Sequence, residues 1–263
     1  MKSILITGAY GGMGKSTAKL FSERGFQVFA LDMRVGDAKE NIIPIQADIT
    51  SEESIRDAYK RVAKMTDELF GIIHFAGVYM LDSLVEIEDE AFKRIFDVNV
   101  RGAALINKVF LPLLKEGSRI LITTSELATL DPLPFTGIYA VTKAALDKYA
   151  YSLCMELQLL GIKVSVLRAG AVDTGMLGAS IAALDRFCDK TALYSCNSKK
   201  FKDIVESVES KSVPASKIAE RCFKIISKRK PKFAYSINRN ILLCLLNILP
   251  KRLQLFIIRR ILK

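Results

Sequence analysis

The sequence lacks the residue patterns from which zinc sites, disulfide frameworks and membrane spans are built. It contains one histidine, His74, and five cysteines that form no C-x-x-C pair. Neither a metal site nor a disulfide framework is therefore predicted, and a reducing, cytoplasmic compartment is expected. The apolar run 241–249 stops at Pro250 after nine residues, whereas a bilayer span needs about 20. The run at Ser3–Thr7 is too short for a secretion signal, so none is expected.

Acidic residues are scarce at one end of the chain. Residues 211–263 contain 14 Lys or Arg and a single acid, Glu220, whereas residues 1–210 contain 25 basic and 27 acidic residues. The net charge of +11 therefore arises from the C-terminal part. This asymmetry argues against a general nucleic-acid-binding surface, so no nucleic-acid partner is predicted.

A length of 263 residues, half of them hydrophobic, suits one large α/β domain with a well-filled core. Short apolar segments alternate with longer helical patterns, which predicts a single Rossmann-like, doubly wound parallel sheet with helices on both faces. The predicted strands are Ser3–Thr7, Gln27–Leu31, Ile42–Gln46, Phe70–Phe75, Ile120–Thr124 and Lys163–Leu167. The predicted helices are Lys15–Arg24, Thr50–Met65, Ala91–Leu114, Tyr139–Leu160 and Pro214–Ser227.

The first predicted turn from strand to helix carries the glycine-rich motif Thr7–Gly14. Glycines there let the backbone approach a pyrophosphate that sits on the helix N-terminus. Asp32 ends the second strand and would accept hydrogen bonds from the adenosine ribose. A carboxylate at that place favours NAD over NADP, although Arg34 and Lys15 are cations that can accommodate a 2′-phosphate.

The same turn also comes within one residue of a P-loop, because Ala9 replaces the first glycine of G-x-x-x-x-G-K-[ST] in the segment that ends at Lys15 and Ser16. A P-loop hydrolase needs a strand that ends in Asp to hold magnesium, and the best candidate strand ends in hydroxyls at Ser125. The P-loop interpretation also leaves Tyr139 and Lys143 unexplained.

Tyr139 and Lys143 are four residues apart in a predicted helix, so their side chains lie on one helix face. A lysine ammonium beside a phenol stabilises the phenolate and lowers the tyrosine pKa. Such a phenol can exchange a proton with a substrate hydroxyl near neutral pH. Taken alone, the pair favours an ordinary surface helix, because Tyr-x-x-x-Lys often occurs by chance.

Three other polar residues stand out. Ser125 follows the predicted fifth strand, and ligands of open parallel sheets bind beyond the carboxyl ends of the strands. Asn99 lies within the predicted helix Ala91–Leu114, where an asparagine is usually a neutral surface residue. His74, at a strand end, is expected to be a packed core residue without a catalytic role.

Separate motifs occur in a fixed order along the chain: Thr7–Gly14, Asp32, Asp48, Asn99, Ser125, Tyr139-x-x-x-Lys143 and Gly170–Thr174. In this order the chain resembles the classical short-chain dehydrogenase/reductase family, from Ser3 to about Thr174 and more weakly to about Tyr235. Among relatives it looks most like the hydroxysteroid and retinol dehydrogenase types. The family usually pairs subunits through two of its helices, so the resemblance implies a homodimer or homotetramer.

The resemblance also implies roles for the polar residues. Tyr139 would be the general acid and base, and Lys143 would lower its pKa and bind the nicotinamide ribose. Ser125 would hold the substrate oxygen, and Asn99 would support a water-linked proton relay. The residues expected at the cofactor are Gly8, Gly11, Gly12, Met13, Gly14, Asp32, Asp48, Ile49, Ala76, Gly77, Tyr139, Lys143, Val172 and Thr174.

The chain departs from the family pattern at two places. The family's Asn-Asn-Ala-Gly after the fourth strand is His74-Phe75-Ala76-Gly77 here, and its Pro-Gly after the sixth strand is Ala169-Gly170. Since all four catalytic positions are occupied by the family's residues, an active enzyme is expected. Two alternatives from other classes remain open, a non-catalytic NAD-binding sensor at a membrane and a P-loop nucleotide hydrolase.

The remaining expectations concern substrate and domains. Residues 1–237 are predicted to form the dinucleotide-binding and catalytic domain, with a substrate lid at about 175–213. The lid supplies apolar residues and no cation cluster, which favours a hydrophobic secondary alcohol or ketone such as a steroid, a retinoid or an acyl-chain compound. The apolar lid residues are Met176, Leu177, Ile181, Ala182, Ala183, Leu184, Phe187 and Leu193.

Residues 238–263 are predicted to form a basic extension of two short amphipathic helices. Apolar residues flanked by cations are typical of helices that lie on an anionic membrane surface. The alternatives are that these helices cover the active site or pack on a partner subunit.

Overall fold

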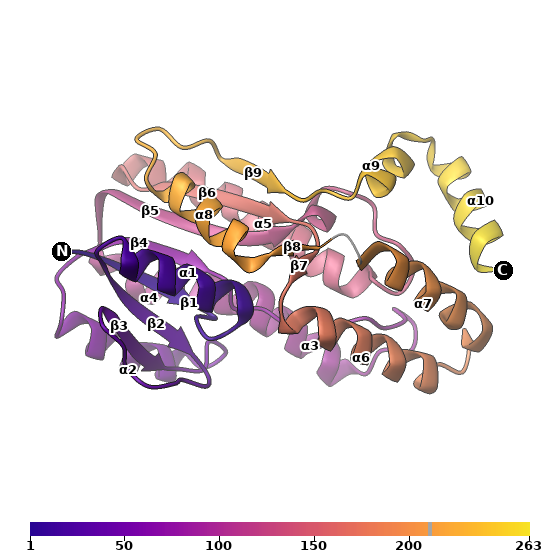
Figure 1. The fold of residues 1–263 in the computed structure, drawn as a ribbon, viewed down its shortest axis with the longest axis horizontal. Helices are drawn as coiled ribbons and strands as arrows, with labels where there is room; N and C mark the ends of the chain where they lie inside the picture. Colours follow the sequence, from indigo (N-terminus) through magenta and orange to yellow (C-terminus); the bar gives the residue numbers. More distant parts are fainter. Residues whose placement is uncertain (210–211) are drawn as a thin grey trace.

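The computed structural model describes residues 1–209 and 212–263, and the side chains of residues 175–181 and 204–209 lie outside what it describes. Seven parallel strands form one sheet in the order β3-β2-β1-β4-β5-β6-β9 (Figure 1). The strands are β1 (Lys2–Thr7), β2 (Phe26–Asp32), β3 (Ile42–Gln46), β4 (Leu69–His74), β5 (Leu114–Ser125), β6 (Lys163–Ala169) and β9 (Ala234–Ile237). The predicted parallel sheet is therefore confirmed.

Helices cover both faces of the sheet, as the sequence pattern predicts. One face packs against α1 (Gly12–Glu23) and α8 (Ala215–Ile226), which contribute Phe21 and Ile218 to a shared core. The other face packs against α2 (Glu52–Ala63), α4 (Gly102–Phe110) and α5 (Gly137–Leu157) in a second core. Because strands buried on both faces need apolar residues on both sides, the buried centres of β1 and β4 are aliphatic, with Ile4–Ile6 in β1 and Ile72–Ile73 in β4.

The strand order reverses beside β1. The chain places β2 and β3 on one side of β1, and then crosses back to place β4 on its other side. The loops that leave β1 and β4 therefore diverge at their carboxyl ends, and ligands of doubly wound sheets bind in the crevice between such loops.

One predicted helix is interrupted. The sequence pattern predicts a single helix over Ala91–Leu114, whereas the structure has α3 (Asp89–Phe96), a π-helical turn at Asp97–Arg101, and then α4. The backbone N–H of Gly102 donates to the carbonyl of Asp97, five residues earlier. A single π turn of this kind often marks a functional site, and here it carries Asn99. The helical region also ends earlier than predicted, since β5 already begins at Leu114.

Beyond the carboxyl ends of the strands lie α6 (Gly175–Lys190) and α7 (Ser195–Glu209), in the predicted lid region (Figure 1). A two-stranded sheet of β7 (Val172–Asp173) and β8 (Val213–Pro214) brackets these helices. Leu184 and Phe187 of α6 pack with Phe201 of α7 in a third, smaller core. The lid region therefore has its own apolar centre.

The extension folds into α9 (Ile241–Ile248) and α10 (Lys251–Leu262), separated at Leu249-Pro250. Asn240 caps α9, because its side chain accepts a hydrogen bond from the backbone N–H of Leu243 at 3.1 Å. In the part of the chain that the structure describes, no helix combines the length and apolar character needed to cross a bilayer.

Candidate active site

The glycine motif forms a tight turn between β1 and α1. Gly8 has a φ of +65°, a conformation that favours glycine. A Cβ atom on Gly14 would lie 2.1 Å from the carbonyl oxygen of Gly8, so the turn is closed too tightly for any side chain there. A Cβ on Gly12 would lie 2.6 Å from the Cβ of Thr174, which shows how closely the chain after β6 approaches the turn.

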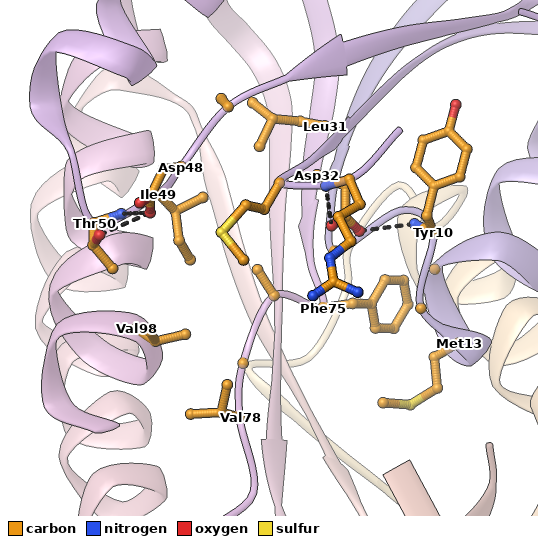
Figure 2. A pocket seen from close by; sticks show the side chains of 18 of the residues that line it. Tyr10, Met13, Leu31, Asp32, Asp48, Ile49, Thr50, Phe75, Val78 and Val98 are labelled. Atoms are coloured by element: carbon orange, nitrogen blue, oxygen red, sulfur yellow. Dashed lines mark hydrogen bonds between the residues drawn. The ribbon is translucent and has the colours of Figure 1, made fainter. Parts of the chain in front are cut away.

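A cavity of about 870 Å³ extends from this turn across the ends of β2 and β3 (Figure 2). Asp32, at the end of β2, lines the cavity, and its carboxylate accepts hydrogen bonds from the backbone N–H groups of Tyr10 at 3.0 Å and Arg34 at 3.4 Å. Asp48 lines the far side, and its Oδ1 accepts from the backbone N–H of Thr50 at 2.8 Å and from its hydroxyl at 2.7 Å. Both acids are therefore held in place by neighbouring donors.

Lys15 does not fit the role that a P-loop would give it. A P-loop lysine reaches the phosphates, whereas Lys15 is exposed and is not among the described residues that line the cavity. The cavity instead opens along Asp32 and Asp48, at the positions where an adenosine would lie in the dinucleotide interpretation.

A second cavity of about 240 Å³ adjoins the first, and Met13, Gly77 and Thr174 line both. Ser125 comes to it from the end of β5, while Tyr139 and Lys143 come from consecutive turns of α5. The Tyr139 phenol and the Ser125 hydroxyl are hydrogen-bonded, and the Lys143 ammonium lies 5.6 Å from the centroid of the Tyr139 ring. Three residues that are far apart in the sequence therefore meet at one cavity.

Asn99 joins this group from the π turn. Its side-chain Oδ1 accepts from the backbone N–H of Val78 at 2.7 Å, and its Nδ2 donates to the carbonyl of Val78 at 2.9 Å and to the hydroxyl of Thr142 at 3.1 Å. This buried amide therefore ties the loop after β4 to α5 between Tyr139 and Lys143. It is not the neutral surface residue that a helical asparagine usually is.

The pKa values of Tyr139 and Lys143 differ from those predicted from the sequence. Burial and the neighbouring Tyr79 raise the pKa of Tyr139 above its ordinary value, while the hydrogen bond with Ser125 lowers it, and the net direction is upward. Burial lowers the pKa of Lys143 to about 8. The lowered tyrosine pKa predicted from the lysine is therefore wrong for this structure, because loss of water around the phenol is the largest effect.

Helix α5 is fixed to the sheet by a mostly buried ion pair. Arg168 on β6 donates two hydrogen bonds to the carboxylate of Asp147 on α5, at 2.9 and 2.7 Å, and the hydroxyl of Thr124 on β5 donates to the same carboxylate at 3.2 Å. This bidentate geometry fixes the orientation of α5 relative to the strand that carries Ser125.

Three residues at the second cavity were not singled out from the sequence. The Thr123 hydroxyl is buried and lacks a hydrogen-bond partner in the described part of the chain. The ring of Tyr79 lies 4.9 Å from that of Tyr139, measured between centroids. Glu126 follows Ser125, and burial raises the pKa of its carboxyl group above the ordinary value. No motif marks them, since only the fold brings them to the cavity.

Every residue expected at the cofactor lines one of the two cavities. Val172, Tyr139 and Lys143 line the second cavity, and the other expected cofactor residues line the first.

The described residues of the predicted lid do not line the second cavity. Ala183, Leu184 and Phe187 are buried in the third core, whereas Ala182 and Leu193 are exposed, so none of these five lines the second cavity. The side chains of Met176, Leu177 and Ile181 lie outside the described residues.

The apolar wall of the second cavity comes from elsewhere. Its lining includes Phe75 and Val78 from the loop after β4, Leu127 from the turn after Ser125, and Ala169 and Val172 from the end of β6 onward. For the five described lid residues the prediction of an apolar pocket wall is therefore corrected, because Ala183, Leu184 and Phe187 pack in the third core while Ala182 and Leu193 are exposed.

His74 has the structural role expected of it. It is buried, and its Nε2 lies 2.9 Å from Oδ1 of Asn107 on α4. The amide of Asn107 in turn donates to the Tyr149 hydroxyl on α5 at 3.2 Å. Because His74 immediately precedes Phe75-Ala76-Gly77, this buried chain of hydrogen bonds supports the wall shared by both cavities.

Comparison with known proteins gives a consistent result. The family model described as short chain dehydrogenase matches residues 2–184. Estradiol 17-beta-dehydrogenase 2 of Mus musculus is 34% identical over 190 residues, which are 68% of this chain and 50% of that protein. NADPH-dependent 1-acyldihydroxyacetone phosphate reductase of Schizosaccharomyces pombe is 31% identical over 179 residues, which are 66% of this chain and 60% of that protein. The chain thus spans little more than half the length of these curated relatives.

The fold has counterparts among solved structures. The 3-ketoacyl-(acyl-carrier-protein) reductase from Brucella melitensis, solved in complex with NADH, has a TM-score of 0.73 and 22% sequence identity to this chain. The match covers 90% of this chain and 96% of that one. At this identity the likeness establishes the fold.

Proposed function

This chain belongs to the short-chain dehydrogenase family, and we propose that it transfers a hydride between a nicotinamide cofactor and a hydrophobic secondary alcohol or ketone. The observation that carries the proposal is the meeting of Ser125, Tyr139 and Lys143 at a cavity that adjoins the one beside the glycine turn. A proton-exchanging phenol at that junction is the arrangement that an alcohol dehydrogenase or ketone reductase needs.

The residues of the first cavity fit a dinucleotide. The closed turn at Gly8 and Gly14 leaves backbone where phosphates would approach, and the amino end of α1 follows directly. Asp48 and Ile49 are suited to an adenine, and Thr174 lies opposite the turn, where the nicotinamide end would be held. These contacts support the assignment of the cofactor site.

We favour NAD over NADP because of Asp32. Two backbone N–H groups hold its carboxylate at the end of β2, where it can accept hydrogen bonds from both ribose hydroxyls and repel a 2′-phosphate. Arg34 also lines the cavity and opposes this preference. A higher kcat/KM with NAD than with NADP is expected, and the reverse order would contradict the proposal.

In the proposed reaction, Tyr139 exchanges a proton with the substrate oxygen and Ser125 holds that oxygen. The raised pKa keeps the phenol of Tyr139 protonated near neutral pH in the ligand-free protein, so it is ready to donate to a carbonyl oxygen during reduction. In oxidation Tyr139 acts as the phenolate and takes the proton of the substrate hydroxyl, and the Lys143 ammonium is the neighbouring cation that stabilises the phenolate. Asn99 holds the loop that carries Gly77 beside the Lys143 ammonium.

The second cavity supports an uncharged, apolar substrate. Phe75, Val78 and Leu127 supply apolar surface, and among the described residues that line it Lys143 is the one cation. Glu126 adds a carboxyl group beside Ser125, which disfavours a substrate with an anionic group at that place. We therefore propose a steroid, a retinoid or an acyl-chain compound that reacts at a secondary alcohol or ketone, with α6 and α7 as the lid above it.

We also propose a homodimer or homotetramer in a reducing compartment such as the cytoplasm. Val141, Tyr151 and Met155 of α5 are each about half exposed, and such apolar positions on one helix suit packing against a second copy. The five cysteines form no C-x-x-C pair in the sequence, which supports a reducing compartment. Light scattering of the purified protein would measure the subunit number.

The test is a panel assay with the purified full chain. NADH formation is followed with NAD and NADP in parallel, across short alcohols, hydroxysteroids, retinol and hydroxyacyl compounds. We expect turnover of a hydrophobic alcohol and a loss of about 10²-fold or more in the Tyr139→Phe variant, because the phenol proton is removed. Equal turnover by Tyr139→Phe would contradict the assignment of Tyr139, and calorimetry with NAD verifies that the variant keeps its cofactor site.

A further inference from the structure

We propose that α9 and α10 form a docking surface for membranes rich in anionic lipid, on which both helices lie at the level of the lipid headgroups. The surface is defined by the outward side chains of residues 241–263. It is independent of the catalytic group, since none of these residues is among the described residues that line either cavity of the active site. The alternative that the two helices close the substrate cavity is therefore not favoured.

The apolar part of the surface is the outer face of α9. Ile241, Leu245 and Ile248 follow one another at helical spacing and are 73%, 56% and 78% exposed. Leu242 beside them is 66% exposed, whereas Leu243 on the opposite side is buried against the body of the protein. A helix that presents large aliphatic side chains outward gains free energy when that face leaves water.

The basic part of the surface is α10. Arg252, Arg259, Arg260 and Lys263 are exposed and form no ion pair within the described part of the chain. Phe256, which is 64% exposed, lies among them on the outer face of the helix. Residues 239–263 contain six Lys or Arg and no acid. An aromatic side chain surrounded by cations is suited to the boundary between anionic headgroups and acyl chains.

The surface is presented in a fixed orientation. Glu126 accepts a hydrogen bond from the backbone N–H of Asn240 at 2.7 Å, and the side chain of Asn247 accepts one from the backbone N–H of Asp131 at 2.5 Å. Lys251 pairs with the carboxylate of Asp131, and the buried Leu262 anchors the end of α10. These contacts use the inner faces of both helices and leave the outer faces open, at the end of the molecule far from the N-terminus (Figure 1).

Charge distinguishes lipid from a second copy of the chain as the occupant. Two copies that met through this surface would bring like charges together, which disfavours association. Residues 1–210 contain 25 basic and 27 acidic residues, so the body of a second copy has no large acidic excess to offer either.

The lengths of the two helices agree with an arrangement in which they lie on the membrane surface. The eight residues of α9 and the 12 of α10 span roughly 12 and 18 Å, whereas the hydrocarbon core of a bilayer is about 30 Å thick.

The test is co-sedimentation of the full chain with vesicles, either of phosphatidylcholine alone or of phosphatidylcholine mixed with phosphatidylserine. We expect binding to the mixed vesicles that weakens as salt is added, and little binding to phosphatidylcholine alone. The triple variant Arg259→Gln, Arg260→Gln, Lys263→Gln should bind more weakly by about fivefold for each cation removed.

The apolar half is tested by Ile241→Ser combined with Leu245→Ser and Ile248→Ser, which should lose at least as much binding. Leu159→Ser with Leu160→Ser is the matched control, because these side chains are 83% and 57% exposed in the turn after α5 and should leave binding unchanged. Circular dichroism verifies that each variant is folded.

Three outcomes would overturn the proposal. The first is failure of the wild-type chain to bind the mixed vesicles. The second is equal binding by wild type and both triple variants. The third is conversion of an oligomer to a monomer by the α9 variant without loss of vesicle binding, which would make the surface a subunit interface. None of these measurements depends on catalysis, so they are separate from the test of the reaction.

Discussion

His74 is expected to titrate near pH 4 in the folded protein, because burial lowers its pKa from 6.5 to about 4. Its ring is enclosed between β4 and α4, with Nε2 hydrogen-bonded to Asn107. Protonation would place a charge among apolar side chains without a counter-ion. The hydrogen bond to Asn107 favours the protonated form only weakly against this loss of hydration.

The consequence for stability follows from the two pKa values. Between pH 6.5 and about 4 the unfolded chain binds more protons than the folded one, so the free energy of unfolding falls as the pH decreases through this window. The gap of about 2.5 pKa units corresponds to about 3 kcal/mol in total, of which about 2 kcal/mol is lost by pH 5. Above pH 7 the contribution no longer changes with pH.

Two measurements check the prediction. Since His74 is the one histidine in the chain, its imidazole signals in NMR spectra are assigned without ambiguity, and they should stay at the neutral position down to about pH 5. His74→Gln keeps a donor near the position of Nε2 but cannot titrate in this range. Urea unfolding at pH 7 and pH 5 should show wild type losing about 2 kcal/mol more than this variant. An imidazole pKa near 6.5, or the same loss in both proteins, would refute the reasoning.

Two further predictions concern the cofactor cavity. Gly14→Ala would place a Cβ 2.1 Å from the carbonyl oxygen of Gly8, so we expect NAD affinity measured by calorimetry to fall by about tenfold or more, and unchanged affinity would show that the turn does not hold the cofactor. Asp32→Ser removes the carboxylate while Arg34 stays, so the ratio of kcat/KM for NADP to that for NAD should rise by about tenfold or more. A ratio that does not change would contradict the role given to Asp32.

Most of the sheet was predictable from sequence because its strands are short apolar runs that end at glycine or polar residues. The strand β9 was not predicted, since Ala234–Ile237 is only four residues long and follows a cluster of cations. The pairing of Val172–Asp173 with Val213–Pro214 joins residues that are 41 positions apart in the sequence, and no local pattern indicates it. Such contacts depend on where the lid helices return to the sheet.

The candidate site was predictable as a set of residue types and not as an electrostatic environment. The spacing of Tyr139 and Lys143 correctly predicts that both lie on one helix, but the pKa of Tyr139 depends on burial and on Tyr79, which arrives from another loop. The lid was misjudged for a related reason. Composition shows that Leu184 and Phe187 are apolar, and only the fold shows that they pack with Phe201 of α7 and do not line the second cavity.

The π turn at Asp97–Arg101 determines how far α3 is rotated about the helix axis relative to α4. Deleting one residue there would restore ordinary α-helical winding and rotate α3 by about 100° relative to α4. Ile95 would leave its buried position, and Arg94 would turn away from the cofactor cavity that it now lines. Surface loops of this fold can gain or lose residues freely, but this helical region cannot change length by one residue without misaligning one wall of the cavity. Variation among descendants of this sequence should therefore appear here as substitution and not as insertion or deletion.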